Sequence, residues 1–188
     1  STGQISLSDC TSNFNSGDGF SVQPDCAIAN CQAAGNSGAG ISTAGSATIT
    51  GCTLSHNGVA GIDAGAGSTI SNCTLEGNVV GVRSTSGHIM VTGCTAHGST
   101  TSGFDIGNDS SILDSSAMDN AGAGIRAGTS CKVRRCSVRG NSPLAGSLGI
   151  YLVGSVNLVE GNSVIAAATG IKFDTGGNKF IRNTCSAN

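Results

Sequence analysis

Residues 47 to 65 read ATITGCTLSHNGVAGIDAG, a stretch in which one cysteine, Cys52, stands between a glycine and a threonine. The same pattern returns 21 residues later as STISNCTLEGNVVGVRSTS, where Cys73 takes the place of Cys52. A fixed period of this length is typical of solenoid proteins, in which each repeat stacks on its neighbour. The role of Cys52 is therefore a question about a column of equivalent residues.

Four such columns run along the chain. The cysteine column comprises Cys10, Cys31, Cys52, Cys73, Cys94 and Cys136, with Ser115 in the one gap. Five positions later, the asparagine column comprises Asn15, Asn36, Asn57, Asn78, Ser99, Asn120 and Asn141. Three positions before the cysteines, an aliphatic column comprises Leu7, Ile28, Ile49, Ile70, Val91, Ile112 and Val133. The fourth column, in which a glycine precedes each member, comprises Phe20, Ile41, Ile62, Val82, Phe104, Ile125, Ile150 and Ile171.

Within each copy, apolar residues alternate with polar ones over short runs that are bounded by glycine and asparagine. Such runs predict short strands. A 21-residue unit with about three short strands, stacked on identical units, predicts parallel sheets along a solenoid. The chain is therefore expected to be all-β.

The repeat resembles the coils of the right-handed parallel β-helix in the pectate-lyase-like superfamily, whose repeat proteins read I-x-x-N/C-x-L-x-x-N-x-x-G-I. The resemblance covers nearly the whole chain and implies a single-stranded β-helix of about eight 21-residue coils. It implies little about function, because this architecture carries lyases, hydrolases, epimerases, adhesins and phage spikes.

The composition excludes some classes of partner. Charged residues make up 11% of the chain and the formal net charge is −2, so nothing points to nucleic acid or an anionic membrane. No apolar run approaches the roughly 20 residues that a membrane-spanning helix needs. We expect no nucleic-acid partner, no membrane span and no cofactor.

We expect residues 1–188 to form one parallel β-helix domain of a longer chain, since neither end carries an evident cap. Flanking chain or a partner subunit should cover the exposed strand edges at both ends. The segment Asn141–Leu152, NSPLAGSLGIYL, has four extra residues and predicts a loop. Beyond it, the pattern places Leu158 in the aliphatic column and Gly161 in the cysteine column.

The cysteine column alternates in phase with Leu54 and Leu75, so we expect its thiols to point inward and to pack as small apolar groups. Cys26 and Cys131 share a second inward column, and disulfides from Cys26 to Cys31 or from Cys131 to Cys136 remain possible. Stacked parallel thiols cannot surround a metal ion tetrahedrally, so no metal site is expected. The asparagine column resembles the asparagine ladder of pectate-lyase-like proteins and implies a structural role.

One outward column looks arranged, because acidic and basic residues alternate along it. It comprises Ser21, Ser42, Asp63, Arg83, Asp105, Arg126, Tyr151 and Lys172. It resembles the carboxylate and arginine strips with which β-helix lyases and hydrolases hold acidic sugars, which makes Asp63, Arg83, Asp105 and Arg126 the candidate catalytic residues. Equally, opposite charges on neighbouring strands can simply pair.

The catalytic motifs of the resembled families are absent: the chain has no Asp-Asp, Gly-His-Gly, Arg-Ile-Lys or Asp-Pro-His-Glu. Asp105 and Asp109 come nearest to a carboxylate pair, although they fall on different segments of a coil. The histidines His56, His88 and His97 occupy three different phases of the repeat and form no column.

Two other surfaces are candidates for binding. A basic cluster comprises Lys132, Arg134, Arg135 and Arg139 and could bind an anionic polysaccharide. A hydroxyl array comprises Thr48, Thr50, Thr69, Ser71 and Thr92. This array is similar to the flat threonine rows of ice-binding β-helices, but Met90, Leu113, Lys132 and Arg134 interrupt it.

The leading hypothesis is a non-catalytic, extracellular or cell-surface β-helix, on a secreted or phage-borne protein, that acts as a scaffold or polysaccharide-interaction module. The alternative is an enzyme, a polysaccharide lyase, epimerase or glycoside hydrolase, acting on an acidic polysaccharide. A third reading is an ice-binding protein.

Overall fold

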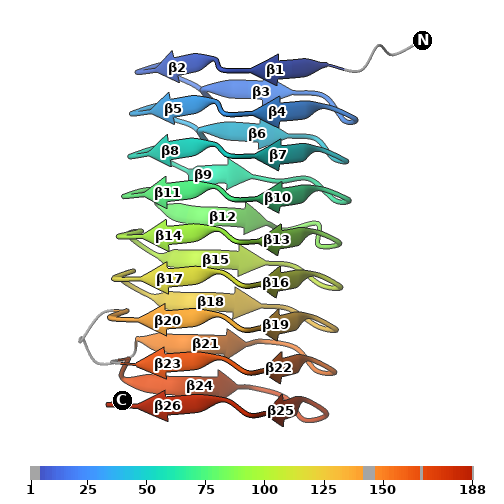
Figure 1. Cartoon of the computed structure of the whole chain (residues 1–188), viewed down its shortest axis with the longest axis vertical. Helices are drawn as coiled ribbons and strands as arrows, with labels where there is room; N and C mark the ends of the chain where they lie inside the picture. The colour runs from blue at the N-terminus through green and yellow to red at the C-terminus, as the bar shows by residue number, and fades with distance from the viewer. Residues whose placement is uncertain (1–4, 142–146, 166, 188) are drawn as a thin grey trace.

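The chain forms a column of short parallel strands (Figure 1). The computed structural model describes residues 5–141, 147–165 and 167–187. Those ranges contain 26 strands and no helix, and so no helix that could cross a membrane. The strands recur in threes, and each coil adds one strand to each of three sheets. The prediction of an all-β solenoid of about eight coils of 21 residues is confirmed.

The three sheets are named A, B and C. Sheet A contains β1 (Ser6–Ser8), β4 (Ala27–Ala29), β7 (Thr48–Thr50), β10 (Thr69–Ser71), β13 (Met90–Thr92), β16 (Ser111–Leu113), β19 (Lys132–Arg134), β22 (Leu158–Glu160) and β25 (Lys179–Ile181). Sheet B contains β2 (Thr11–Asn13), β5 (Gln32–Ala34), β8 (Thr53–Ser55), β11 (Thr74–Glu76), β14 (Thr95–His97), β17 (Ser116–Met118), β20 (Ser137–Arg139), β23 (Ser163–Ile165) and β26 (Thr184–Ser186). Sheet C contains β3 (Phe20–Val22), β6 (Ile41–Thr43), β9 (Ala60–Asp63), β12 (Val80–Ser84), β15 (Ser102–Ile106), β18 (Ala123–Ala127), β21 (Leu148–Leu152) and β24 (Thr169–Phe173).

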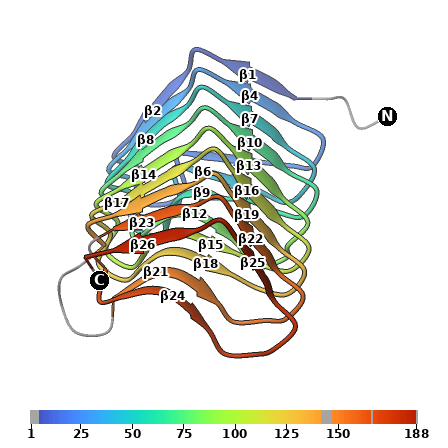
Figure 2. The same ribbon diagram turned by 60° about the horizontal axis from the view of Figure 1, so that its bottom comes forward.

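Strand register carries the sequence repeat into space. All strand pairs are parallel, and in sheet A Ile49 aligns with Ile28 on one side and with Ile70 on the other. Figure 2 shows the three sheets as the sides of a three-sided column. The predicted columns fill its interior, where Ile49, Leu54 and Ile62 are each 0% exposed. A residue's place in the repeat thus determines its place on the column.

Single residues with left-handed backbone make the corner between sheets A and B. Gly51 has φ of 64° there, and Asn72 has φ of 54° in the next coil. Glycine and asparagine tolerate this conformation better than other residues. A Cβ on Gly51 would also lie 2.7 Å from Asn30 Oδ1, so this corner has no room for a side chain at Gly51.

The register after residue 146 differs from the sequence prediction. Ile125 aligns with Ile150, which is the spacing of 25 residues expected from four extra residues. Val133, however, aligns with Val159, and the Cys136 amide donates to Asn162 Oδ1 26 residues away. The assignment of Leu158 and Gly161 to the two inward columns was therefore wrong by one position. The turn between β21 and β22 is one residue longer than the turn between β18 and β19.

The asparagine column forms a hydrogen-bonded ladder at the corner between sheets B and C. Asn36 Nδ2 donates to Asn57 Oδ1 and Asn57 Nδ2 to Asn78 Oδ1, both at 3.0 Å. From Asn36 onward, each asparagine of the column also donates to a backbone carbonyl, as Asn57 does to Ala33 at 3.1 Å. Asn36, Asn57, Asn78, Asn120 and Asn141 are almost fully buried, so the ladder satisfies polar groups that would otherwise lack partners.

Ser99 interrupts the ladder. Its hydroxyl is buried and finds no hydrogen-bond partner among the described residues. The Ser99 amide still donates to Asn120 Oδ1 at 2.9 Å, but Ser99 offers no amide oxygen to Asn78. A glycine lies beside each buried asparagine of the ladder, as Gly61 lies beside Asn78. Gly81 is the equivalent glycine beside residue 99, so the corner keeps room for a longer side chain at that position.

The cysteine column points inward as predicted. Cys31, Cys52, Cys73, Cys94 and Cys136 are buried, as are Cys26 and Cys131 of the second column. All nine cysteines are free thiols, so the two possible disulfides are not formed. Cys52 donates to the Thr50 carbonyl at 3.4 Å, and its neighbours make the same bond two residues back along the chain. Cys52 therefore fills a narrow interior.

The gap in the ladder predicts a stabilising substitution. Ser99→Asn should raise the free energy of unfolding by about 1 kcal/mol, because it restores one net intramolecular hydrogen bond. The reciprocal change, Asn57→Ser, should lower it by about 1 to 3 kcal/mol, because the buried Asn36 amide loses its acceptor. Denaturant unfolding of the three proteins measures both. A Ser99→Asn protein less stable than the native one would contradict this account of the ladder.

Burial of the thiols predicts their reactivity. Burial raises the pKa of the Cys136 thiol to about 11, and hydrogen bonding with Cys73 together with burial raises the pKa of Cys52. Since the thiolate is the reactive form, a thiol reagent should modify exposed Cys185 first and Cys52 only on unfolding. Mass spectrometry of the labelled native protein checks this order. Labelling of Cys52 as fast as that of Cys185 would overturn the inward assignment.

Candidate functional site

The predicted charged column lies on the outer face of sheet C. Strand register aligns Asp63 with Arg83, Arg83 with Asp105 and Asp105 with Arg126. Tyr151 and Lys172 continue the same row over the next two coils. Successive members inherit the coil spacing of about 4.8 Å. The four candidate residues Asp63, Arg83, Asp105 and Arg126 are therefore brought together, and we call them the charged row.

The charged row consists of two ion pairs with different geometry. Arg83 holds Asp63 with two bonds, Nε to Oδ1 at 3.1 Å and Nη2 to Oδ2 at 2.5 Å. Arg126 holds Asp105 with one bond, Nη1 to Oδ1 at 2.7 Å. Hydrogen bonding to the Asp63 carboxylate raises the pKa of Arg83, so this guanidinium stays charged. Each pair is about one-third exposed and adds only about 0.2 to 1 kcal/mol to stability.

The second ion pair keeps unused hydrogen-bonding groups. Among the described residues, Nε and Nη2 of Arg126 have no acceptor, and Oδ2 of Asp105 has no donor. The Nε and Nη2 edge of a guanidinium matches a carboxylate geometrically and can bind it through two parallel bonds. In Arg83 that edge already holds Asp63. Arg126 is thus the member of the charged row that can bind an added carboxylate.

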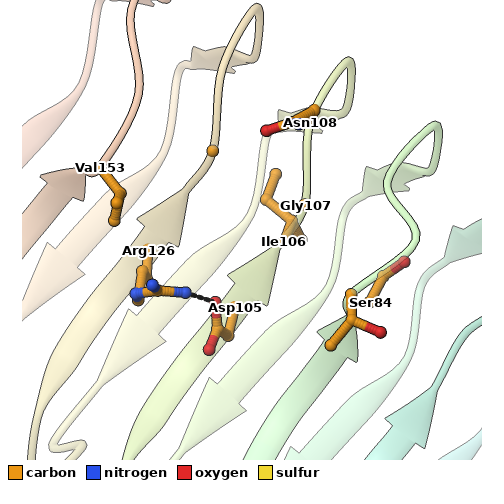
Figure 3. Close-up of a pocket in the computed structure, with 9 residues that line it drawn as sticks. Ser84, Asp105, Ile106, Gly107, Asn108, Arg126 and Val153 are labelled. Atoms are coloured by element: carbon orange, nitrogen blue, oxygen red, sulfur yellow. Dashed lines mark hydrogen bonds and ion pairs between the residues drawn. The ribbon is translucent and has the colours of Figure 1, made fainter.

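A hollow of about 280 Å³ lies beside this pair (Figure 3). Four successive strands of sheet C are followed directly by Thr85, Gly107, Gly128 and Val153. Because the two glycines lack side chains, an opening is left between Thr85 and Val153. Asp105 and Arg126 also line the hollow, and Asn108 projects from the turn after β15 (Figure 3).

Asn108 is fixed by a backbone contact. Its Oδ1 accepts from the Thr129 amide at 2.8 Å, which leaves Nδ2 without an acceptor among the described residues. A Cβ on Gly128 would lie 2.4 Å from that Oδ1, so glycine is needed for Asn108 to take this position. Sequence reasoning missed Asn108, although Gly107 and Gly128 stand 21 residues apart in the repeat.

Beyond Arg126, the row continues into a cluster of three polar side chains. Tyr151 Oη donates to Asp174 Oδ2. Lys172 Nζ lies 3.3 Å from Asp174 Oδ1 and 4.8 Å from the centre of the Tyr151 ring. The bond to Asp174 raises the pKa of Tyr151, because it favours the protonated phenol. Asp174 was not among the residues singled out from the sequence.

The basic cluster is divided between two sheets. Lys132 and Arg134 lie on β19 of sheet A, Arg139 lies on β20 of sheet B, and Arg135 forms the corner between them with φ of 53°. Arg134 Nε lies 2.9 Å from Glu160 Oε2, and Arg135 Nε lies 2.6 Å from Asp114 Oδ1. Two of the four cations are therefore engaged with acids, and the four do not converge on one face.

The remaining candidates do not form a site. Asp109 faces His88, with 3.7 Å between Oδ2 and Nε2, so it makes no carboxylate pair with Asp105. The hydroxyl array lies on sheet A as expected, and register places Met90 beside Thr69 and Leu113 beside Thr92. No group of three or more histidine, cysteine, aspartate or glutamate side chains within the described ranges is placed to hold a metal ion.

Comparison with known proteins agrees with this architecture. The family model described as "Right handed beta helix region" matches residues 41–188. The chain therefore belongs to the right-handed β-helix family. A search of curated proteins gives no match.

Similar solved structures include those of two epimerases. The A-module of the Azotobacter vinelandii mannuronan C-5 epimerase AlgE4 is 18% identical, with a TM-score of 0.62 over 97% of this chain and 54% of that one. The periplasmic alginate epimerase AlgG is 14% identical, with a TM-score of 0.61 over 88% of this chain and 50% of that one. The chain spans about half the length of these structures, and at such identities the likeness shows the fold alone.

Tyr151 offers a direct test of the geometry beyond Arg126, because it is the one tyrosine of the sequence and there is no tryptophan. Its titration, followed by tyrosinate absorbance, should have a midpoint above the ordinary value of about 10. Asp174→Asn should lower that midpoint, because the phenol loses its charged acceptor. A native midpoint at or below the ordinary value would show that the bond to Asp174 is not formed.

Proposed function

We propose that the domain is a non-catalytic module of an extracellular or cell-surface protein and that it binds an acidic polysaccharide on sheet C. The observation that carries this proposal is the free edge of Arg126 beside the hollow. A parallel sheet of this kind is suited to a long polymer, because equivalent side chains of successive coils form rows that run along the column axis. The alginate epimerases among the structural neighbours support a uronic acid polymer as the class of ligand.

The charged row is better suited to binding than to hydrolysis. Glycoside hydrolysis needs two carboxyl groups that face the scissile bond, roughly 5 to 9.5 Å apart, with one of them acting as a proton donor. Asp63 and Asp105 lie two coils apart, and an arginine holds each of them. Each carboxylate is therefore engaged in an ion pair, and the two lie in one row on the same sheet and do not face each other across a scissile bond.

Lyase or epimerase chemistry needs a base that removes a carbon-bound proton beside the sugar carboxylate. Tyr151 lies next to Arg126 along the row, on the side away from Asp105, and its hydroxyl donates a hydrogen bond to Asp174. Its raised pKa keeps it protonated near neutral pH, so it is a poor base. The arrangement therefore favours recognition of an acidic sugar over its chemical conversion.

Binding of polygalacturonate and alginate, with dextran as the neutral control, tests the proposal. The native domain should bind the acidic polymers and not dextran, and the affinity should fall as salt is added. Arg126→Gln should weaken binding by about tenfold or more, the usual value of a charge-assisted hydrogen bond. Arg83→Gln is the matched control and should change the affinity less than about twofold, because Arg83 is engaged with Asp63.

The same incubations distinguish binding from catalysis. Unsaturated sugar products or new reducing ends, formed by the native protein and lost in Asp105→Ala, would establish the enzyme instead. Absence of binding to every acidic polymer would reject the proposal. Equal loss in Arg83→Gln and Arg126→Gln would show that the row acts only by its summed charge.

A further inference from the structure

The hollow beside Arg126 has the dimensions and chemistry of a site for one sugar unit. Small-molecule sites usually measure about 300 to 1,000 Å³. At about 280 Å³ this hollow lies just below that range, which suits a single ring rather than several. Two further polar atoms of its lining, Asp105 Oδ2 and Asn108 Nδ2, have no hydrogen-bond partner among the described residues. These features belong to one place on sheet C and not to the whole charged row.

We infer that this hollow is a subsite that selects one uronic acid unit of a polymer, an inference that rests on the proposed function. The sugar carboxylate binds the Nε and Nη2 edge of Arg126. Asp105 Oδ2 accepts a hydrogen bond from a sugar hydroxyl, and Asn108 Nδ2 donates to a sugar oxygen. Thr85 and Val153 bound the unit along the column axis.

The donor and acceptor set explains why the unit must be acidic. A bound neutral sugar would remove water from the Nε and Nη2 edge of Arg126 and supply no charged acceptor in its place. Leaving a charged group unpaired costs more free energy than leaving a neutral group unpaired. The single carboxylate oxygen left on Asp105 repels a second anion, so the subsite accepts one carboxylate. The neighbouring coil cannot duplicate the subsite, because Arg83 gives its matching edge to Asp63.

Asn108 permits a nearly isosteric test. Asn108→Asp keeps the oxygen that accepts from the Thr129 amide and replaces the free NH2 donor with negative charge. The ligand should therefore be repelled while the turn is preserved. Asn13 gives the matched control: its Oδ1 accepts from the Ala34 amide at 2.8 Å, and it is exposed on sheet B. Asn13→Asp adds the same charge away from the hollow.

The experiment measures the affinity of trigalacturonate and of an alginate trimer for the native protein and both variants, with maltotriose as the neutral probe. Asn108→Asp should weaken binding of the acidic trimers by about tenfold, and Asn13→Asp by less than about twofold. Maltotriose should bind none of the three proteins measurably. Circular dichroism confirms that both variants keep the fold.

Each other outcome has a distinct meaning. Equal affinity of the acidic trimers for native protein and Asn108→Asp overturns the subsite, and the proposed function stands if the acidic polymers still bind. Maltotriose binding as tight as trigalacturonate binding also overturns the subsite, because the carboxylate would then play no part. If neither trimers nor acidic polymers bind the native protein, the proposed function itself fails.

Discussion

The backbone hydrogen bonds between coils are the constraint on which the rest of the structure depends. Each strand is joined in parallel register to the equivalent strand one repeat away, so a column in the sequence becomes a column in space. A slip by one residue would turn every inward side chain of that strand to the solvent. The interior therefore needs residues of matching size and period, and the outer faces can vary.

Two inward columns hold this register in different ways. The cysteines pack as small apolar groups beside the sheet A to sheet B corner. The asparagines act through directed hydrogen bonds, and the amides of Asn36 and Asn57 each join their own coil to the next. After the longer coil, the cysteine column itself changes to asparagine, with Asn162 Nδ2 donating to Asn183 Oδ1 at 2.9 Å. Cysteine and asparagine thus occupy equivalent positions at the corner between sheets A and B.

The fold could be predicted from the sequence because the columns carry it. The inward thiols and the asparagine ladder follow from the 21-residue period. The alignment of Asp63 with Arg83, which are 20 residues apart, follows from the glycine and aliphatic residue that precede each of them. The register beyond Val133 could not be predicted, since the length of the turn after β21 is not part of the repeat. Because this turn contains one added residue, Val159 occupies the position in the aliphatic column for which Leu158 was predicted.

The candidate site was predicted only in part. Spacing placed the charged row on one face, but it could not distinguish Arg83 from Arg126, because their difference lies in how each side chain meets its aspartate. The hollow arises where Gly107 and Gly128 follow two strands and Asn108 turns toward Thr129. Those contacts depend on the folded turn and not on residue type alone.

The central claim is that the free edge of Arg126 is the anion-binding group of sheet C. The most direct measurement is the nitrogen–proton NMR spectrum of the arginine Nε groups, recorded while trigalacturonate is added. The Arg126 signal should shift with saturable dependence on ligand, and the Arg83 signal should stay in place. Shifts confined to Arg134, Arg135 and Arg139, with Arg126 unchanged, would contradict the claim and place binding on the basic cluster.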